Sequence, residues 1–210
     1  MPASGLPRQV DILVSATLLA VTSPLVAAAA VAIKLETPGP VLFRQQRVGL
    51  AGRPFEMLKL RTFKHGAPPE GTWVPLDERN DPRITRVGRW LRATSLDEVP
   101  NLVNVLRGDM ALVGPRPTIP AQVAEYTAEQ HRRLEVRPGI TGLAQVSGRR
   151  SLSWPERIAI DVWYVDNRTP LLDLRILLRT AAQMLGLDRG RSRRGSGTGP
   201  GSGRLPEPST

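Results

Sequence analysis

Two adjacent carboxylates, Asp97 and Glu98, are the side chains of this chain best suited to chemistry. A carboxylate can act as a nucleophile or as a ligand for a hard divalent cation. The pair follows Thr94 and Ser95, and both spacings match the S/T-x-x-D/E pattern of a capping box. The pattern therefore predicts that a helix begins here, with Pro100 tolerated in its first turn. Helix capping alone would also explain the pair.

Several cations accompany the carboxylates in the sequence. The segment 55–63 (FEMLKLRTF) alternates apolar and polar residues, which is typical of a half-buried strand. Its two cations are two residues apart, so they share a face and can converge on one anion, unless that face is simply solvated. A helix N-terminus also favours anions. The expected convergent cations are Lys59, Arg61, Arg116 and Arg149.

Composition narrows the class of partner. The formal net charge of +10 implies an anion: nucleic acid, lipid headgroups or a phosphorylated small substrate. Aromatic residues are only 4% of the chain and form no basic RNA-binding motif, which argues against nucleic acid. The absence of cysteine excludes disulfides and thiolate chemistry, and two histidines argue against a multi-histidine metal centre. Neither a Walker loop nor a dinucleotide fingerprint occurs.

A membrane segment is expected near the N-terminus. Residues 12–33 are uncharged and apolar apart from small hydroxyl residues, and such a helix can cover a hydrocarbon core of roughly 30 Å. Ser23-Pro24 lies near the middle, and proline removes the hydrogen bond to the Ala20 carbonyl, which predicts a kink. Two topologies remain open on these grounds: a kinked span, or a helix that enters the membrane and returns to the same face. A cleaved signal peptide has less support.

The remaining pattern predicts a domain of short elements. We expect four regions: a polar lead at 1–9, the membrane helix at 10–34, a catalytic domain at 35–187 and a disordered basic tail at 188–210. The expected elements are a strand at 41–43 and a turn at 49–52; a helix from Thr85 and one over 120–134; a Gly-rich turn at 137–142 and a strand at 143–146; and helices over 155–167 and 171–187.

The ordered series of motifs resembles the bacterial sugar transferase family, the monotopic phosphoglycosyl transferases that start lipid-linked glycan assembly. The resemblance runs from about Val10 to Gly186. It is to the minimal catalytic form, without further N-terminal transmembrane helices. The motifs are VDILVS followed by Ser23-Pro24, KLETPGPVLFRQQRVG, FEMLKLRTF, DPRITRVGRWLRATSLDEVPNLVNVLRGDMALVGPRP, RPGITGLAQVSGR and DVWYVDN.

The resemblance implies an α+β fold. Its N-terminal membrane helix would be re-entrant and broken at Ser23-Pro24. A small, mainly helical cytoplasmic domain with short strands and interfacial amphipathic helices would follow. It implies residence at the bacterial cytoplasmic (inner) membrane, contact with membrane lipid and no nucleic acid, and it leaves a homodimer open.

The resemblance also implies the reaction: a sugar-1-phosphate moves from a nucleotide diphosphate sugar, usually a UDP-sugar, to polyprenyl phosphate. Asp97 would attack the sugar-bearing phosphate, Glu98 would position the metal or assist the acceptor phosphate, and Mg²⁺ would bridge Asp97 and the diphosphate. Exopolysaccharide assembly is a typical pathway. The implied phosphate or substrate contacts are Lys59, Arg61, Arg116, Arg89, Gln145 and Arg149, and Asp161 is a second candidate for the metal.

Two alternatives stand beside this interpretation. The chain could be a non-catalytic membrane-anchored adaptor whose basic face binds anionic lipid or another polyanion, with the carboxylate pair serving only as a cap. It could also be a family member that has lost activity, although the intact Asp97-Glu98 pair argues against this. One departure from the family is local: residues 167–170 (NRTP) stand where many members have Trp-Ser.

Overall fold

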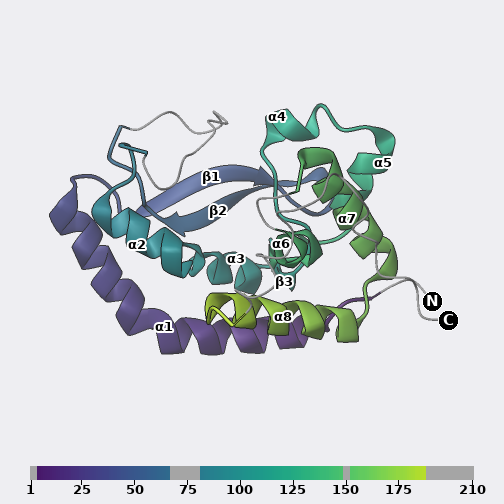
Figure 1. Ribbon diagram of the computed structural model, residues 1–210, viewed down its shortest axis with the longest axis horizontal. Helices are drawn as coiled ribbons and strands as arrows, with labels where there is room; N and C mark the ends of the chain where they lie inside the picture. The colour runs from purple at the N-terminus through teal and green to yellow at the C-terminus, as the bar shows by residue number, and fades with distance from the viewer. Residues whose placement is uncertain (1–3, 67–80, 149–151, 188–210) are drawn as a thin grey trace, which may run out of the picture.

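The computed structural model describes residues 4–66, 81–148 and 152–187. A β hairpin lies over a group of short helices, and one long helix runs along the lower side of the molecule (Figure 1). This is the mixed α+β domain with one long N-terminal apolar helix that the sequence predicts. The predicted tail at 188–210 and the candidate Arg149 lie outside the described residues.

Helix α1 (Arg8–Glu36) is the membrane segment expected from the sequence. Within the described part of the chain it is the one helix long and apolar enough to cross a membrane, and most of it is not buried by the protein. Leu13, Val21 and Leu35 are 69%, 72% and 83% exposed. Large apolar side chains left open in such number indicate membrane association.

The helical hydrogen-bond pattern of α1 continues through Pro24. Pro24 has no N–H for the Ala20 carbonyl, and the Ser23 hydroxyl donates to that carbonyl at 2.9 Å instead. The helix changes direction along its length without being interrupted (Figure 1). The expected break at Ser23-Pro24 is therefore corrected to a bend within one continuous helix, because a neighbouring hydroxyl replaces the lost backbone donor.

The hairpin is built by β1 (Leu42–Val48) and β2 (Pro54–Leu60), which pair antiparallel with Leu42 opposite Leu60. The predicted strand at 41–43 therefore continues through the basic run to Val48. The predicted turn is present, and it contains the 3₁₀ turn η1 (Leu50–Gly52).

Helix α2 (Arg86–Thr94) begins where the sequence predicts, because the Thr85 hydroxyl accepts from the Gly88 N–H and caps it. Gly88 also allows close packing: a Cβ there would lie 2.1 Å from the Thr62 carbonyl oxygen. The 3₁₀ turn η2 (Leu96–Glu98) and helix α3 (Asn101–Arg107) follow.

A short parallel pair forms the second sheet. Strand β3 (Ala111–Val113) pairs with β4 (Gly139–Thr141), which lies inside the segment expected to be only a turn. The predicted strand at 143–146 is instead helix α6 (Leu143–Ser147). Both errors have one cause: elements of three to five residues are too short for hydrophobic periodicity to identify.

The expected long helix over 120–134 is also wrong. The chain forms two short α-helices and a 3₁₀ turn there, and these pieces pack against β1 and the later helix Trp154–Asn167. Thr127 begins a new capping box in the middle of the segment, with Gln130 as its partner. The three pieces are α4 (Pro120–Val123), α5 (Ala128–His131) and η3 (Arg132–Leu134).

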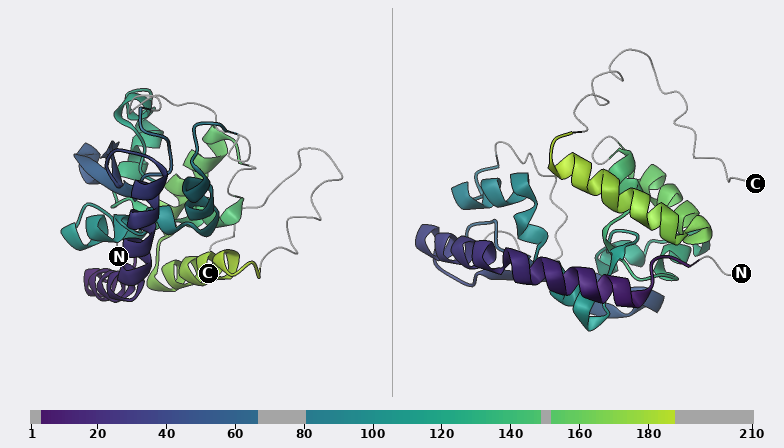
Figure 2. Two further views of the ribbon diagram at one scale, coloured as in Figure 1. Left: turned by 90° about the vertical axis from the view of Figure 1, so that its left-hand side faces the viewer. Right: turned by 90° about the horizontal axis from the view of Figure 1, so that it is seen from below.

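The last two helices are as predicted: α7 (Trp154–Asn167) and α8 (Pro170–Met184). Ile176 of α8 and Tyr164 of α7 join the largest apolar core cluster, against which Val14 of α1 also packs. Helices α1 and α8 both lie along the lower side of the molecule in Figure 1 and in the left view of Figure 2. The outer leucines of α8 are exposed: Leu171, Leu174 and Leu178.

Candidate active site

Asp97 and Glu98 lie in the 3₁₀ turn η2 between α2 and α3, so the predicted helix start is wrong. Thr94 is the last residue of α2, and its hydroxyl donates to the Trp90 carbonyl at 2.9 Å. Ser95 adopts the left-handed conformation (φ 58°) and makes no side-chain cap. The α-helix therefore ends at Ser95, and the 3₁₀ turn that follows presents the two carboxylates.

Glu98 is held by two cations. Its Oε1 accepts from Lys59 Nζ at 2.7 Å and from Arg116 Nη2 at 2.8 Å. These partners come from strand β2 and from the loop after β3, so three separate segments meet at one carboxylate. Burial alone would raise the pKa of Glu98, but Arg116 and Lys59 overcome this effect and hold its pKa well below the ordinary value. Glu98 is therefore ionised at neutral pH.

Asp97 is the less satisfied member of the pair. Its side chain is buried, and among the described residues no hydrogen bond reaches its carboxylate. Burial raises its pKa, Lys59 opposes this, and the neighbouring Glu98 raises it further. A buried carboxylate beside a cation is suited to attack an electrophile or to bind one.

Asn104 of α3 positions Lys59 by binding the backbone of strand β2. The Asn104 side chain is fully buried; its Oδ1 accepts from Leu58 N–H at 3.1 Å and its Nδ2 donates to the Glu56 carbonyl at 2.7 Å. These bonds fix β2 against the helix that follows the carboxylate pair. Burial lowers the pKa of Lys59, and Glu98 opposes the shift.

Arg116 extends from a loop whose carbonyl groups are all occupied. Pro115 and Pro117 have no N–H and cannot form a ladder, so the loop is held through its oxygens. The four donors are Gly139 N–H to Pro115 at 3.0 Å, Arg133 Nη2 to Arg116 at 3.1 Å, Arg47 Nη1 to Pro117 at 3.2 Å and Val48 N–H to Thr118 at 2.9 Å.

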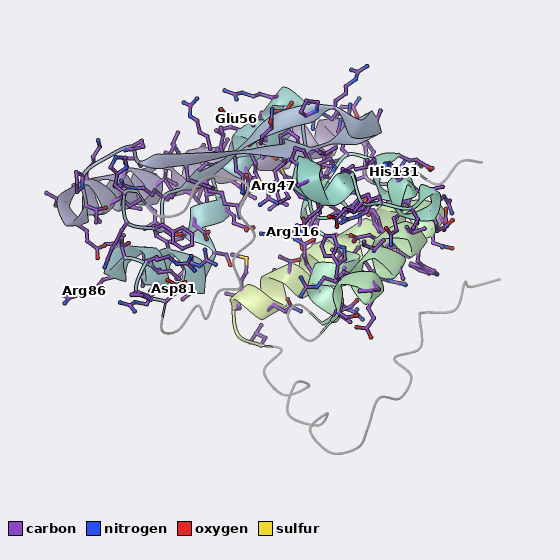
Figure 3. All side chains as sticks on the ribbon, turned by 90° about the horizontal axis from the view of Figure 1, so that it is seen from above. Arg47, Glu56, Asp81, Arg86, Arg116 and His131 are labelled. Atoms are coloured by element: carbon purple, nitrogen blue, oxygen red, sulfur yellow. The ribbon has the colours of Figure 1, made fainter. Side chains whose placement is uncertain are left out.

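Arg47 of β1 is a site residue that sequence reasoning missed. Its guanidinium contacts the Pro117 carbonyl and lies near Arg116, toward which it points in Figure 3. Burial lowers its pKa to about 10, and the positive charge of Arg116 adds to this. Two arginines beside each other make a strongly electropositive wall. Its signal in the sequence is the basic run at 44–47 (RQQR), which follows the predicted strand at 41–43.

The structure brings Lys59 and Arg116 to the carboxylate pair but sends Arg61 elsewhere. The Arg61 guanidinium donates to the Thr37 carbonyl at 2.9 Å and also to the Pro38 carbonyl. Strand β2 ends at Leu60, so the predicted shared face of Lys59 and Arg61 is not formed. Arg61 fastens the exit of α1 instead of meeting an anion beside Lys59.

The other candidates have separate surroundings. Arg89 is exposed on α2, and the Gln145 amide donates to the Ile140 carbonyl at 3.0 Å. Asp161 of α7 is buried and accepts from Arg133. Burial raises the pKa of Asp161, and Arg133 opposes this shift.

The site fits a magnesium ion that is bound by a carboxylate together with phosphate groups of the substrate. Across the described ranges no cluster of three or more His, Asp or Glu side chains gathers. Mg²⁺ in phosphoryl-transfer sites is commonly held by one or two carboxylates together with substrate phosphates. Asp97, whose oxygens accept no hydrogen bond from the residues that the structure describes, matches that manner of binding.

Comparison with known proteins decides the family. The family model described as "Bacterial sugar transferase" matches residues 3–186. The chain belongs to the bacterial sugar transferase family. It is therefore an enzyme, a phosphoglycosyl transferase by family and by its named relatives.

Relatives of this sugar transferase come from distant bacteria. A UDP-glucose:undecaprenyl-phosphate glucose-1-phosphate transferase of Caulobacter vibrioides is 49% identical over 189 residues, 86% of this chain and 70% of that protein. The uncharacterized sugar transferase EpsL of Bacillus subtilis is 42% identical over 180 residues, 86% of this chain and 87% of that protein. A relative of Xanthomonas campestris with the same name as the Caulobacter protein is 43% identical over 172 residues, 78% of this chain but only 35% of its own length.

Proposed function

We propose that this sugar transferase moves a sugar-1-phosphate from a UDP-sugar to undecaprenyl phosphate and releases UMP, the first step in assembling a lipid-linked polysaccharide. The names of the relatives supply both substrate classes. The observation that carries the proposal is the pair itself: a buried Asp97 whose oxygens are free among the described residues, beside a Glu98 held by two cations.

Asp97 is the nucleophile in this proposal. One of its carboxylate oxygens attacks the sugar-bearing phosphorus and forms an acyl phosphate, while the bond to the bridging oxygen breaks and UMP departs with that oxygen. A phosphate oxygen of undecaprenyl phosphate then attacks the same phosphorus and frees the Asp97 carboxylate. Splitting the transfer into two displacements lets one site handle two large substrates in turn.

The cations stabilise the charge that develops on the diphosphate. The Arg116 side chain is half exposed and can bind a phosphate oxygen while its backbone stays fixed. Glu98 orients Lys59 and Arg116 from one oxygen, so the positive charges face Asp97 before substrate arrives. Mg²⁺, when bound at Asp97 with the diphosphate, would supply Lewis-acid neutralisation of phosphate charge.

The anchoring of α1 supports a re-entrant topology. At its start, Leu6 N–H donates to Asp173 Oδ2 at 2.8 Å and Leu112 N–H to Asp11 Oδ1 at 3.1 Å. At its end, Glu36 accepts from the Arg86 and Val87 N–H groups at 2.6 and 2.9 Å.

Both ends of α1 thus bind the same folded domain, which a helix crossing to the far side of a bilayer could not do. The common lower side of α1 and α8 would face the lipid (Figure 2). We place the domain on the cytoplasmic face, where a UDP-sugar is available.

The experiment is an assay of the membrane-reconstituted chain with a panel of UDP-sugars, Mg²⁺ and undecaprenyl phosphate, reading UMP release. We expect release with one or a few sugars, dependent on the lipid for repeated turnover. Folded protein without release across the panel would overturn the proposal in favour of the membrane-anchored adaptor. That alternative explains the basic surface but not a buried carboxylate without a hydrogen-bond partner among the described residues.

A further inference from the structure

The backbone oxygen of Arg116 is bound by a side chain that lies outside the carboxylate site. Of the four donors that hold the loop 115–118, two are backbone N–H groups and two are the guanidinium groups of Arg47 and Arg133. Arg133 donates to the carbonyl of the very residue whose side chain binds Glu98. The position of the Arg116 backbone therefore depends on where the Arg133 guanidinium is fixed.

Arg133 is held through both terminal nitrogens of its guanidinium group, Nη1 and Nη2. It is only 4% exposed, which is uncommon for an arginine unless it is paired. Nη2 also donates to Asp161 Oδ2, and Nη1 donates to the Tyr126 hydroxyl. The guanidinium carbon lies 5.6 Å from the ring centroids of both Tyr126 and Trp154.

A second contact returns from this cluster to the same loop. The Tyr126 hydroxyl lies 2.9 Å from Thr118 Oγ1, and Thr118 is itself buried. The cluster therefore holds the loop at two points, at the Arg116 carbonyl and at the Thr118 side chain. A planar guanidinium with several donors in fixed directions suits this task, and a lysine does not.

We propose that Arg133 is a positioning residue of this transferase: anchored by Asp161 and Tyr126, it sets the Arg116 loop so that the Arg116 side chain meets the diphosphate. This inference rests on the proposed function. It assigns Asp161 a structural partner in place of the metal. Neither Arg133 nor Asp161 contacts the substrate; both act through Arg116.

The first test measures equilibrium binding of UDP, with Mg²⁺ present, to the folded chain in lipid nanodiscs. We expect Arg133→Lys to weaken UDP binding by about tenfold, as loss of one or two charge-assisted bonds to the loop would. In an Arg116→Ala background the same change should alter binding less than twofold. The matched control is Arg132→Lys, because Arg132 is the adjacent arginine with exposed ion pairs to Glu129 and Asp166. An undiminished effect in the Arg116→Ala background, or an equal effect in the control, would overturn the inference.

The second test uses Asp161→Asn, which keeps an oxygen acceptor for Arg133 but removes the negative charge that strengthens the binding of Mg²⁺ to a carboxylate. We expect the Mg²⁺ concentration for half-maximal UMP release to stay within twofold of the unaltered enzyme, while KM for the UDP-sugar rises. A rise of tenfold or more in the Mg²⁺ requirement would make Asp161 a metal ligand and reject the positioning role. Failure of the unaltered chain to release UMP would reject the proposed function instead, which separates the two ideas.

Discussion

Lys59 Nζ lies 2.7 Å from Glu98 Oε1, and this ion pair joins strand β2 to the 3₁₀ turn that carries Asp97. The pair is largely shielded, with the Lys59 side chain 15% and the Glu98 side chain 22% exposed. Its influence extends one residue further, because the Lys59 charge also opposes the rise in the pKa of Asp97 that burial causes. Lys59 is thus the largest of the charges that favour ionisation of the proposed nucleophile, against the larger effect of burial.

Replacing Lys59 with methionine should move the acid limb of activity to higher pH. Asp97 must be ionised to attack, and its raised pKa means that kcat/KM falls as pH drops through a value above the ordinary aspartate pKa. Burial and Glu98 raise the pKa of Asp97, and Lys59 opposes both effects. Without Lys59 the pKa of Asp97 rises further, so the acid limb moves to higher pH. The measurement is kcat/KM against pH for UMP release.

The control for this shift is Arg44→Met on the paired strand, because Arg44 forms an exposed ion pair with Glu56, with the two side chains 61% and 50% exposed. That variant should leave the limb in place. A Lys59→Met limb that stays in place or moves to lower pH would separate Lys59 from the ionisation of Asp97.

Asp97→Asn should lower UMP release by about 10³-fold or more, because an amide oxygen is a poor nucleophile for phosphorus. A direct readout is mass spectrometry of the enzyme after incubation with UDP-sugar and no lipid acceptor. The peptide that contains Asp97 should gain one sugar phosphate in the unaltered chain and in Glu98→Gln, although more slowly in the latter. An adduct that persists in Asp97→Asn would assign the nucleophile to another residue.

The sequence predicted the long elements and the chemistry-bearing pair, and it failed where position depends on tertiary contacts. Helices α2, α7 and α8 have side-chain caps and α1 has a long apolar run, and all of these signals act locally. In the sequence, Thr94 and Ser95 match the S/T-x-x-D/E capping pattern equally well. The preceding helix instead ran on to Thr94, and Ser95 took a left-handed turn that no local pattern indicates.

The cations show the same limit. Lys59 and Arg61 share a spacing, but only Lys59 reaches Glu98, because β2 ends between them at Leu60. Arg47 and Arg133 contact the Arg116 loop from residues 70 and 17 positions away in sequence. No local sequence pattern indicates a contact with residues so far along the chain. The sequence alone therefore does not assign Arg47 or Arg133 to the Arg116 loop.

Asn104→Ala should destabilise the domain by about 2–4 kcal/mol, since it leaves the buried Leu58 N–H and Glu56 carbonyl without their partner. Lys59 lies next to Leu58, so kcat/KM should fall as well. The measurement is thermal or denaturant unfolding in detergent, with UMP release in parallel. Asn167→Ala is the control, because the Asn167 side chain donates to the Trp163 carbonyl of its own helix and, among the described residues, to no other element. Equal stability of the two variants would show that Asn104 does not fix β2 against α3.

The topology of α1 can be tested cleanly because the chain has no cysteine. We expect Ser4→Cys and Leu187→Cys to resist a membrane-impermeant maleimide in intact spheroplasts and to react after lysis, since α1 returns to the cytoplasmic face. The cysteine-free chain gives the labelling background.

Pro24→Leu together with Ser23→Leu removes both the proline and the hydroxyl that replaces its missing donor, and so favours a straight helix. In that variant we expect the position-4 cysteine to become reactive from outside. Labelling of Ser4→Cys in intact spheroplasts without these changes would establish a simple span, and the contacts of Leu6 and Asp11 with the domain would then have to be absent in the membrane.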